Sequence, residues 1–356
     1  MGIEIRELSA SDEGAYEQLL QGCPHAMVYH SSKFRRFLKA FLPSQAHDHY
    51  LLAYQDQVLV GALPAFALDG PEGPVLNSLP FFGSHGSILA SDVSSPATLA
   101  LADGMMELCA KLRVAFATVI DTPFQSHERL LKEKMAFQYT DDRIGQVTVL
   151  PTATDASPAD EKLMALYHPK TRNIVRKALR GPFAFGHGSS PHILDDLHRL
   201  HDANLGSKGG VTKPRRFFSE IARNLECDVD YRVYTARNDK GAIVCALLLL
   251  YYKDTVEYFV PASDPAWKAL QPLSALIHIA MRDAVIERGA RRWNWGGTWT
   301  SQVGVHHFKS RWGTKDLPYR YYTRVSPDVS RLEGLSPPQL LAAYPWFYTV
   351  PFQALS

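Results

Sequence analysis

Two stretches of the chain predict the same order of structural elements, and this repetition constrains the fold more than any other feature. The first stretch combines a hairpin, a long helix and a short strand, over residues 50–54, 58–68, 96–112 and 116–120. The second combines the same elements over residues 243–252, 255–261, 273–288 and 292–295. The repeated order predicts an internal duplication in a mixed α/β (α+β) protein.

The stretch PTATDASPAD, residues 151–160, is rich in Pro, Ser, Thr and Asp and predicts a loop between two halves. We therefore expect one domain over residues 1–150 and a second over 151–325. Prolines alternate with aromatic residues over 326–356, which predicts a tail lying on the surface of a domain.

Composition excludes several classes of protein. Hydrophobic residues make up 46% and charged residues 21% of the chain, as in folded globular proteins. The net charge of +2 is too small to favour DNA binding by the field of the whole protein. The N-terminus is acidic and the longest apolar run, residues 244–250, is too short to cross a bilayer. We expect a cytoplasmic protein without stable membrane insertion.

Cysteine and histidine spacing argues against a metal site. The four cysteines show no CxxC spacing, and the 14 histidines show no HExxH pair. On a strand, the neighbours His306 and His307 would point to opposite faces and could not share one metal ion.

A strand that ends in two glycines is the sharpest local feature. In RWNWGGT, residues 292–298, Trp295 is followed by Gly296, Gly297 and Thr298, where the backbone could approach a ligand closely. The nearby segment HHFKSRWG, residues 306–313, places Lys309 beside Phe308. The alternative is a structural turn followed by a surface lysine.

A basic helix is the second feature. Arg172, Arg176 and Arg180 recur at every fourth residue of KTRNIVRKALRG, residues 170–181, and so share one helix face. Guanidinium groups bind phosphate oxygens through two hydrogen bonds, which suits a nucleotide or a tRNA backbone. The alternative is a solvated helix face.

These segments, together with residues 246–265 and 273–298, resemble the FemAB-like branch of the GNAT acyltransferase superfamily, which contains the aminoacyl-tRNA-dependent transferases that build peptidoglycan bridges. Residues 51–68 and 79–90 resemble its N-terminal GNAT-like domain. The resemblance implies two tandem GNAT-like domains, each with a mixed, mainly antiparallel sheet flanked by helices, and a substrate cleft at their interface.

The resemblance also implies roles. Lys309 would contact the acyl donor and stabilise charge on the attacked carbonyl, and Phe308 belongs to the same motif. Arg172 and Arg176 would lie near the phosphates of the donor or a nucleotide. Glu257 and Tyr258 lie on a strand expected beside the cleft, one facing in and the other out, and Tyr258 is the weakly favoured substrate contact. His30 and His85 could line the cleft.

The implied reaction forms an amide bond on an amine of a cell-wall or envelope precursor. No tightly bound cofactor is expected; the donor would be an aminoacyl-tRNA or an acyl thioester.

Two departures leave other functions open, since no coiled-coil arm for tRNA appears and His85-Gly86-Ser87 replaces an Arg-Gly-Pro type step. One alternative is a thioester-dependent N-acyltransferase (acyl-CoA or acyl-carrier) acting on a polysaccharide or small metabolite. Against acetyl-CoA, residues 267–274 lack the glycines of a pyrophosphate loop. The other alternative is a non-catalytic GNAT-like binding module.

Overall fold

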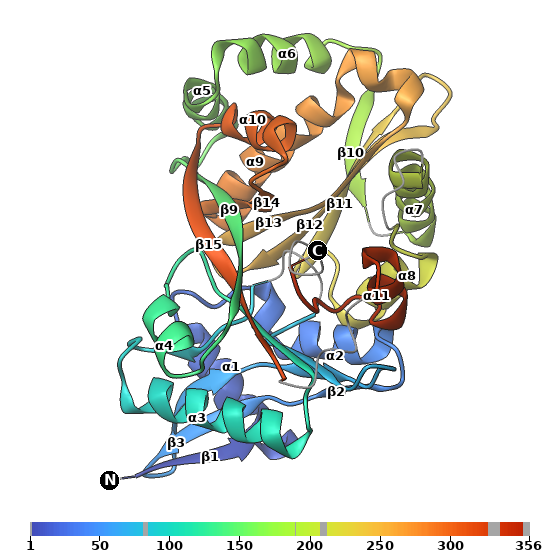
Figure 1. The fold of residues 1–356 in the computed structure, drawn as a ribbon. Helices are drawn as coiled ribbons and strands as arrows, with labels where there is room; N and C mark the ends of the chain where they lie inside the picture. Colours follow the sequence, from blue (N-terminus) through green and yellow to red (C-terminus); the bar gives the residue numbers. More distant parts are fainter. Residues whose placement is uncertain (1, 81–84, 189, 207–211, 327–334, 352–356) are drawn as a thin grey trace. The chain divides into compact units, whose positions relative to one another are not determined.

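The computed structural model describes residues 2–80, 85–188, 190–206, 212–326 and 335–351. The chain divides into two compact units, residues 1–144 with 317–356 and residues 145–316 (Figure 1). This division differs from the expected boundary after residue 150 and from a separate tail after 325. The reason is strand β15 (Thr314–Val325), whose second half pairs with β8 (Phe116–Ile120) and brings the C-terminal residues into the first unit.

Contacts of the C-terminal residues explain this assignment. Tyr344, Phe347 and Tyr348 are buried, and the side chain of Asn77 exchanges hydrogen bonds with the backbone of Tyr348 at 2.7 and 2.8 Å. The segment therefore contributes to the core of the first unit instead of only crossing its surface.

The first unit contains a four-stranded antiparallel sheet in the order β1-β3-β4-β7, formed by Ile3–Glu7, Leu51–Gln55, Val58–Leu63 and Leu89–Ala90. Helix α3 (Pro96–Lys111) covers one face of this sheet. It begins at Ser95, whose hydroxyl accepts a hydrogen bond from the Thr98 N–H, and Pro96 occupies the first helical position, where its missing N–H costs no hydrogen bond.

A second group of strands in this unit runs in the order β8-β6-β5-β2, with β6, β5 and β2 at Val75–Asn77, Phe66–Leu68 and Ala46–Asp48. The single strand expected over 58–68 is split at Pro64, because proline has no N–H for the strand ladder. Short helical elements complete the unit: η1 (Ala10–Asp12), α1 (Glu13–Gly22), η2 (Val28–His30), α2 (Ser32–Phe41), α4 (Glu128–Glu133) and α11 (Pro337–Ala343).

The second unit is built on a sheet in the order β10-β11-β12-β13-β14, formed by Ala184–Gly188, Tyr231–Arg237, Ile243–Tyr252, Thr255–Ser263 and Arg292–Trp299. All pairs are antiparallel except β13 with β14. Helices α5 (Ala156–Leu166), α6 (Pro169–Leu179) and α9 (Pro272–Arg288) pack together on the face that holds the hydrophobic core.

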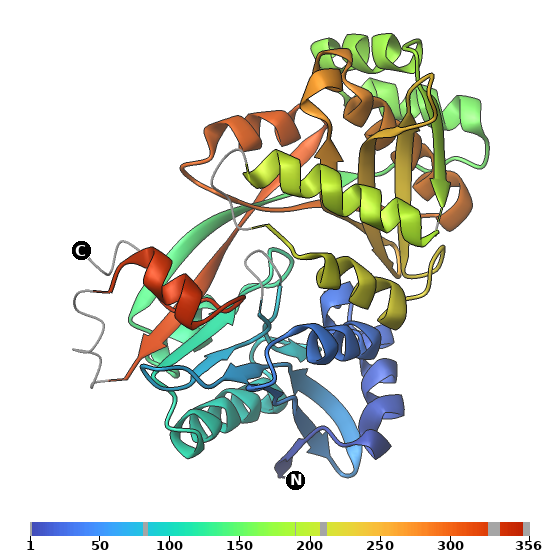
Figure 2. The same ribbon diagram turned by 90° about the vertical axis from the view of Figure 1, so that its right-hand side faces the viewer.

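Helix α7 (Pro191–Gly206) packs against strands β12 and β13, which it crosses in Figure 2, and contacts α8 (Arg215–Asn224). Residues 244–250 of β12 are therefore apolar without alternation, because side chains on both faces of the strand are buried. The 3-10 helix η3 (Pro265–Leu270) leads into α9, which ends at Gly289 with φ +59°.

The expected fold class is confirmed: both units are mixed and mainly antiparallel, with helices against their sheets. The predicted element orders both occur, but the last strand of each has a different kind of partner. Strand β14 pairs in parallel with β13, a strand of its own hairpin, whereas β8 pairs in parallel with β6, which lies outside the β3–β4 hairpin. The sequence analysis did not anticipate β9 (Tyr139–Val149) or β15. It was wrong to treat His306 and His307 as strand residues, because they lie on helix α10 (Val303–Ser310).

Candidate functional site

Lys309 is held at the end of strand β14 by its side-chain nitrogen. Only 6% of the residue is exposed. Its Nζ donates to Thr298 Oγ1 at 2.8 Å and lies 3.3 Å from both the Gly296 and Gly297 carbonyl oxygens. Helix α10 returns towards β14 and so places this lysine against the residues that the sequence had singled out as a double glycine.

The acceptors around Lys309 are all neutral. Within the described part of the chain, no carboxylate lies within ion-pair distance of its ammonium. Burial lowers the pKa of Lys309 to about 8, because the charged form loses water without gaining a counter-ion. The side chain is thus cationic at neutral pH and close to its titration point.

Gly296 has a backbone conformation that side chains rarely adopt, with φ +71°. Its N–H donates to Asn294 Oδ1 at 3.0 Å, and Asn294 Nδ2 donates to Glu257 Oε2 at 2.9 Å. Asn294 and Glu257 are buried and face each other in the parallel register of β13 and β14. The sequence pointed to Glu257 on a strand beside the expected cleft but did not connect it with Asn294; two polar residues within apolar strands were the available signal.

Four aromatic rings from β13, β14 and the segment around Lys309 form one cluster. The Trp295 ring lies 4.9 Å from Tyr258, 5.7 Å from Trp312 and 6.1 Å from Phe308, measured between centroids. Trp295 is 2% exposed and donates from Nε1 to Thr148 Oγ1, so its contacts are with the core. Phe308, at 36%, has the largest exposed fraction of these four residues. Burial raises the pKa of Tyr258, which keeps its hydroxyl protonated.

The arginines of the basic helix α6 have different surroundings. Arg172 turns back to the end of α5, where Nη1 donates to the Tyr167 carbonyl oxygen at 2.9 Å. The same corner is tied to the segment after Lys309, because the His168 N–H donates to the Arg311 carbonyl oxygen. Arg172 therefore supports the turn between α5 and α6 and is not among the residues lining the neighbouring pocket.

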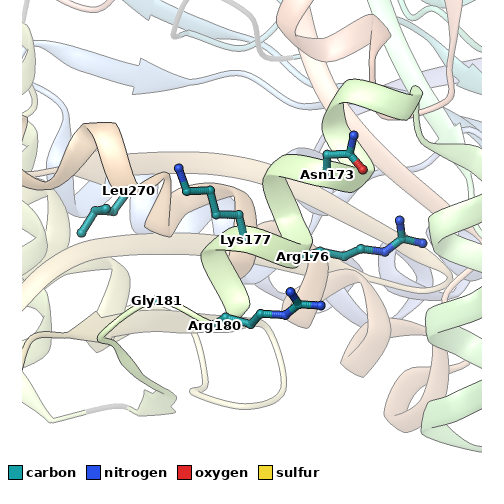
Figure 3. Close-up of a pocket in the computed structure, with 6 residues that line it drawn as sticks. All are labelled: Asn173, Arg176, Lys177, Arg180, Gly181 and Leu270. Carbon is teal, nitrogen blue, oxygen red and sulfur yellow. The ribbon is translucent and has the colours of Figure 1, made fainter.

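That pocket has a volume of about 450 Å³ and is lined by Asn173, Arg176, Lys177, Arg180, Gly181 and Leu270. Figure 3 shows the Arg176 and Arg180 guanidinium groups extending in the same direction from α6. Within the described ranges, none of the three cationic side chains forms an ion pair with a carboxylate. The pocket therefore offers uncompensated positive charge to an anion.

His30 and His85, which the sequence suggested for a cleft, are fully buried in the first unit. Burial lowers their pKa values to about 4 and about 3, so both are neutral at physiological pH. The first unit also holds a buried polar cluster that the sequence analysis missed, in which Asp121 contacts Ser87 and His127.

Two findings bear on other classes of site. His306 Nε2 lies 2.7 Å from Asp316 Oδ2, and the described residues contain no group of three or more His, Cys, Asp or Glu side chains suited to a metal ion. Among the helices that the structure describes, none combines the length and the apolar composition needed to cross a membrane.

Residues 169–310 match the family model described as an acetyltransferase (GNAT) domain. No match was found among curated proteins.

Solved structures with the same fold cover nearly the whole chain. The structure of FemX has a TM-score of 0.70 at 14% identity and covers 89% of this chain and 96% of its own. A tandem GNAT protein from the clavulanic acid biosynthesis pathway has a TM-score of 0.55 at 12% identity, covering 92% and 99%. The C-terminal domain of a putative lysylphosphatidylglycerol synthetase from Agrobacterium fabrum has a TM-score of 0.57 at 12% identity, covering 96% and 99%.

The resemblance seen in the sequence is confirmed by these two kinds of match. The matched range includes the basic helix, strand β14 and Lys309. Residues 169–310 match a GNAT acetyltransferase domain, and the chain shares its fold with FemX and with a tandem GNAT protein.

Proposed function

We propose that this protein is an N-acyltransferase that moves an acyl or aminoacyl group from a phosphate-bearing donor onto an amine of a cell-wall or envelope precursor. The observation that carries the proposal is the buried ammonium of Lys309, held by three neutral oxygens. The fold shared with FemX and with a lysylphosphatidylglycerol synthetase domain supports an aminoacyl donor and an envelope acceptor.

In this reaction the amine nitrogen attacks the carbonyl carbon of an ester or thioester. The C–N bond forms, the carbonyl oxygen gains negative charge, and collapse expels the alcohol or thiol, while the proton lost by the amine balances the one taken up by the leaving group. Lys309 supplies a fixed positive charge for the developing oxyanion. Because the ammonium has no carboxylate partner among the described residues, its field is not already neutralised.

The pocket on α6 is the proposed site for the donor's phosphates. Arg176, Lys177 and Arg180 provide the positive charge, and Asn173 adds an amide. Both candidate donors, aminoacyl-tRNA and acyl thioesters of phosphopantetheine carriers, bring phosphate groups, so the pocket suits their shared chemistry. No tightly held cofactor is required, and we place the reaction in the cytoplasm.

A thioester donor is the second candidate, because the family model matched by residues 169–310 describes acetyltransferases. In that case the acceptor would be a polysaccharide or a small metabolite.

Calorimetry and thermal-shift measurements of the purified protein should compare acetyl-CoA, a longer acyl-CoA, a UDP-linked muropeptide and a charged tRNA. A bound ligand raises the apparent stability by mass action. Mass spectrometry of the acceptor should then detect the amide product.

Binding and transfer with charged tRNA would support aminoacyl transfer, and the same result with only a CoA ester would assign the thioester reaction. Binding without any transfer would contradict the proposal and indicate a binding module. Lys309→Ala should lower the rate of transfer. Lys240→Ala, which alters an exposed lysine on the turn before β12, is the matched control.

A further inference from the structure

Three hydrogen bonds connect a buried carboxylate with the ammonium of Lys309. Glu257 Oε2 accepts from Asn294 Nδ2 at 2.9 Å, and Asn294 Oδ1 accepts from the Gly296 N–H at 3.0 Å. The Gly296 carbonyl oxygen, in turn, lies 3.3 Å from Lys309 Nζ. The path runs through β13, β14 and α10 within the second unit.

Few side chains could replace Asn294 between Glu257 and the Gly296 N–H. Glu257 Oε2 accepts a hydrogen bond on one side of this position, and the Gly296 N–H can only donate on the other. A side chain between them must donate on one side and accept on the other, which an amide does and a carboxylate or an aliphatic group does not. Asn294 meets this need and is fully buried, so water does not replace it.

We propose that Asn294, anchored by Glu257, is a positioning residue that sets the Gly296 and Gly297 carbonyl oxygens at the distance needed to hold the Lys309 ammonium ready for the developing oxyanion. This inference rests on the proposed function and adds two residues to its machinery. Asn294 acts through Gly296, since its hydrogen bonds join the Glu257 side chain and the glycine backbone.

The backbone at Gly296 explains why such an anchor is needed. Its positive φ is accessible to glycine at little cost, but glycine also leaves the backbone free to adopt other conformations. Misplacement of a catalytic group by about 1 Å can cost about 10²-fold in rate. A hydrogen bond to the Gly296 N–H from a buried, anchored amide restricts this freedom.

The experiment exchanges the two side chains. Asn294→Asp removes the donor and brings two carboxylates together, whereas Glu257→Gln in the same chain restores an amide between them. In the double variant the new carboxylate accepts from both Gly296 and the new amide, so the path is re-formed with its groups reversed. Asn77→Ala is the matched control, since it removes a buried amide that bonds the backbone of Tyr348 in the first unit.

The first readout needs no substrate. NMR titration of 13C-labelled lysine side chains, with the Lys309 signal assigned from Lys309→Met, reports the pKa of this lysine directly. We expect Asn294→Asp and Asn294→Ala to move it upwards, towards the ordinary lysine value of about 10.4, as water reaches the ammonium. Turnover should fall about 10-fold to 100-fold in both, and the double variant should regain most of the titration and the turnover.

An unchanged Lys309 titration in Asn294→Ala would overturn the proposal, as would a double variant no better than Asn294→Asp. Loss of turnover in Glu257→Gln alone, with an unchanged titration, would also overturn it, because Glu257 would then take part in proton transfer. If wild-type protein transfers no acyl group to any acceptor, the proposed function fails, while the titration still decides whether Asn294 positions Lys309.

Discussion

The ends of strands β8 and β14 occupy the same position in the two predicted element orders, yet they bury charges of opposite sign. After β8, Asp121 accepts hydrogen bonds from the Thr122 and His127 backbone N–H groups and from the Ser87 hydroxyl, and lies 3.1 Å from His127 Nδ1. Near the end of β14, the backbone carbonyl oxygens of Gly296 and Gly297 each lie 3.3 Å from the ammonium of Lys309.

The difference lies in how completely each charge is satisfied. The oxygens of Asp121 are surrounded by donors on the protein, so the carboxylate has little left to offer a ligand. Among the residues that the structure describes, the partners of Lys309 are neutral, and burial holds its pKa well below that of a free lysine. The comparison teaches that the first charge is satisfied within its own unit, whereas the second is available to the charge that develops in the proposed reaction.

Removing the first charge should have the largest effect on folding. Asp121→Ala leaves buried N–H and O–H groups without acceptors, and each such group costs about 1–3 kcal/mol. We expect a loss of about 3 kcal/mol or more in the free energy of unfolding, measured by urea denaturation. Asp92→Ala, at an exposed carboxylate in the same unit, should change it far less. Equal losses in both variants would contradict the structural role.

Removing the second charge should act on turnover. Lys309→Ala should lower kcat by about 10²-fold or more, equivalent to about 2.7 kcal/mol, because the oxyanion loses its cation. Steady-state kinetics with the donor found in the binding experiment would measure it, with Lys240→Ala at wild-type turnover. Unchanged kcat in Lys309→Ala would remove this residue from the mechanism.

The pH dependence sharpens the same side of the comparison. The ammonium form of Lys309 is present below its pKa of about 8 and is lost as the pH rises through that value. We therefore expect kcat to fall above pH 8, approaching about 10-fold per pH unit, or about 1.4 kcal/mol. Lys309→Arg keeps its charge at these pH values, so any activity it retains should not show this fall. A wild-type profile that rises steadily to pH 10 would indicate a lysine acting as a base.

Local sequence patterns predict some residues of the candidate site but not the contacts between them. The double glycine and Lys309 each stand out locally, but the approach of Lys309 Nζ to the Gly296 and Gly297 carbonyl oxygens depends on how α10 packs against β14. Glu257 and Asn294 meet only because β13 and β14 run in parallel with a particular register, which no local pattern encodes. The strand β9 begins with Tyr-Thr-Asp-Asp-Arg, whose charges hide the strand pattern, and its pairing partners lie far along the chain.

The basic pocket should give a smaller effect, because its cations are exposed to solvent. Arg176→Glu should weaken binding of the phosphate-bearing donor about 10-fold, or about 1.4 kcal/mol, with a loss that shrinks as salt is added. Calorimetry at two salt concentrations measures both. Arg223→Glu, at an exposed arginine on α8 away from the residues lining this pocket, is the control and should leave the affinity unchanged. An unaltered Kd in Arg176→Glu would place the donor elsewhere.

Arg172 should give the smallest effect and should separate structure from binding on a single helix. Helical spacing puts Arg172 and Arg176 on one face, but Arg172 lies in the first turn of α6, within reach of the unsatisfied carbonyls where α5 ends. Arg172→Ala should therefore lower the free energy of unfolding by about 1 kcal/mol and leave the donor Kd unchanged. Arg176→Ala should do the opposite, weakening binding at constant stability. Urea denaturation and calorimetry of both variants measure their stability and their donor affinity. A weaker donor affinity in Arg172→Ala at unchanged stability would place Arg172 in the phosphate site, as the sequence predicted.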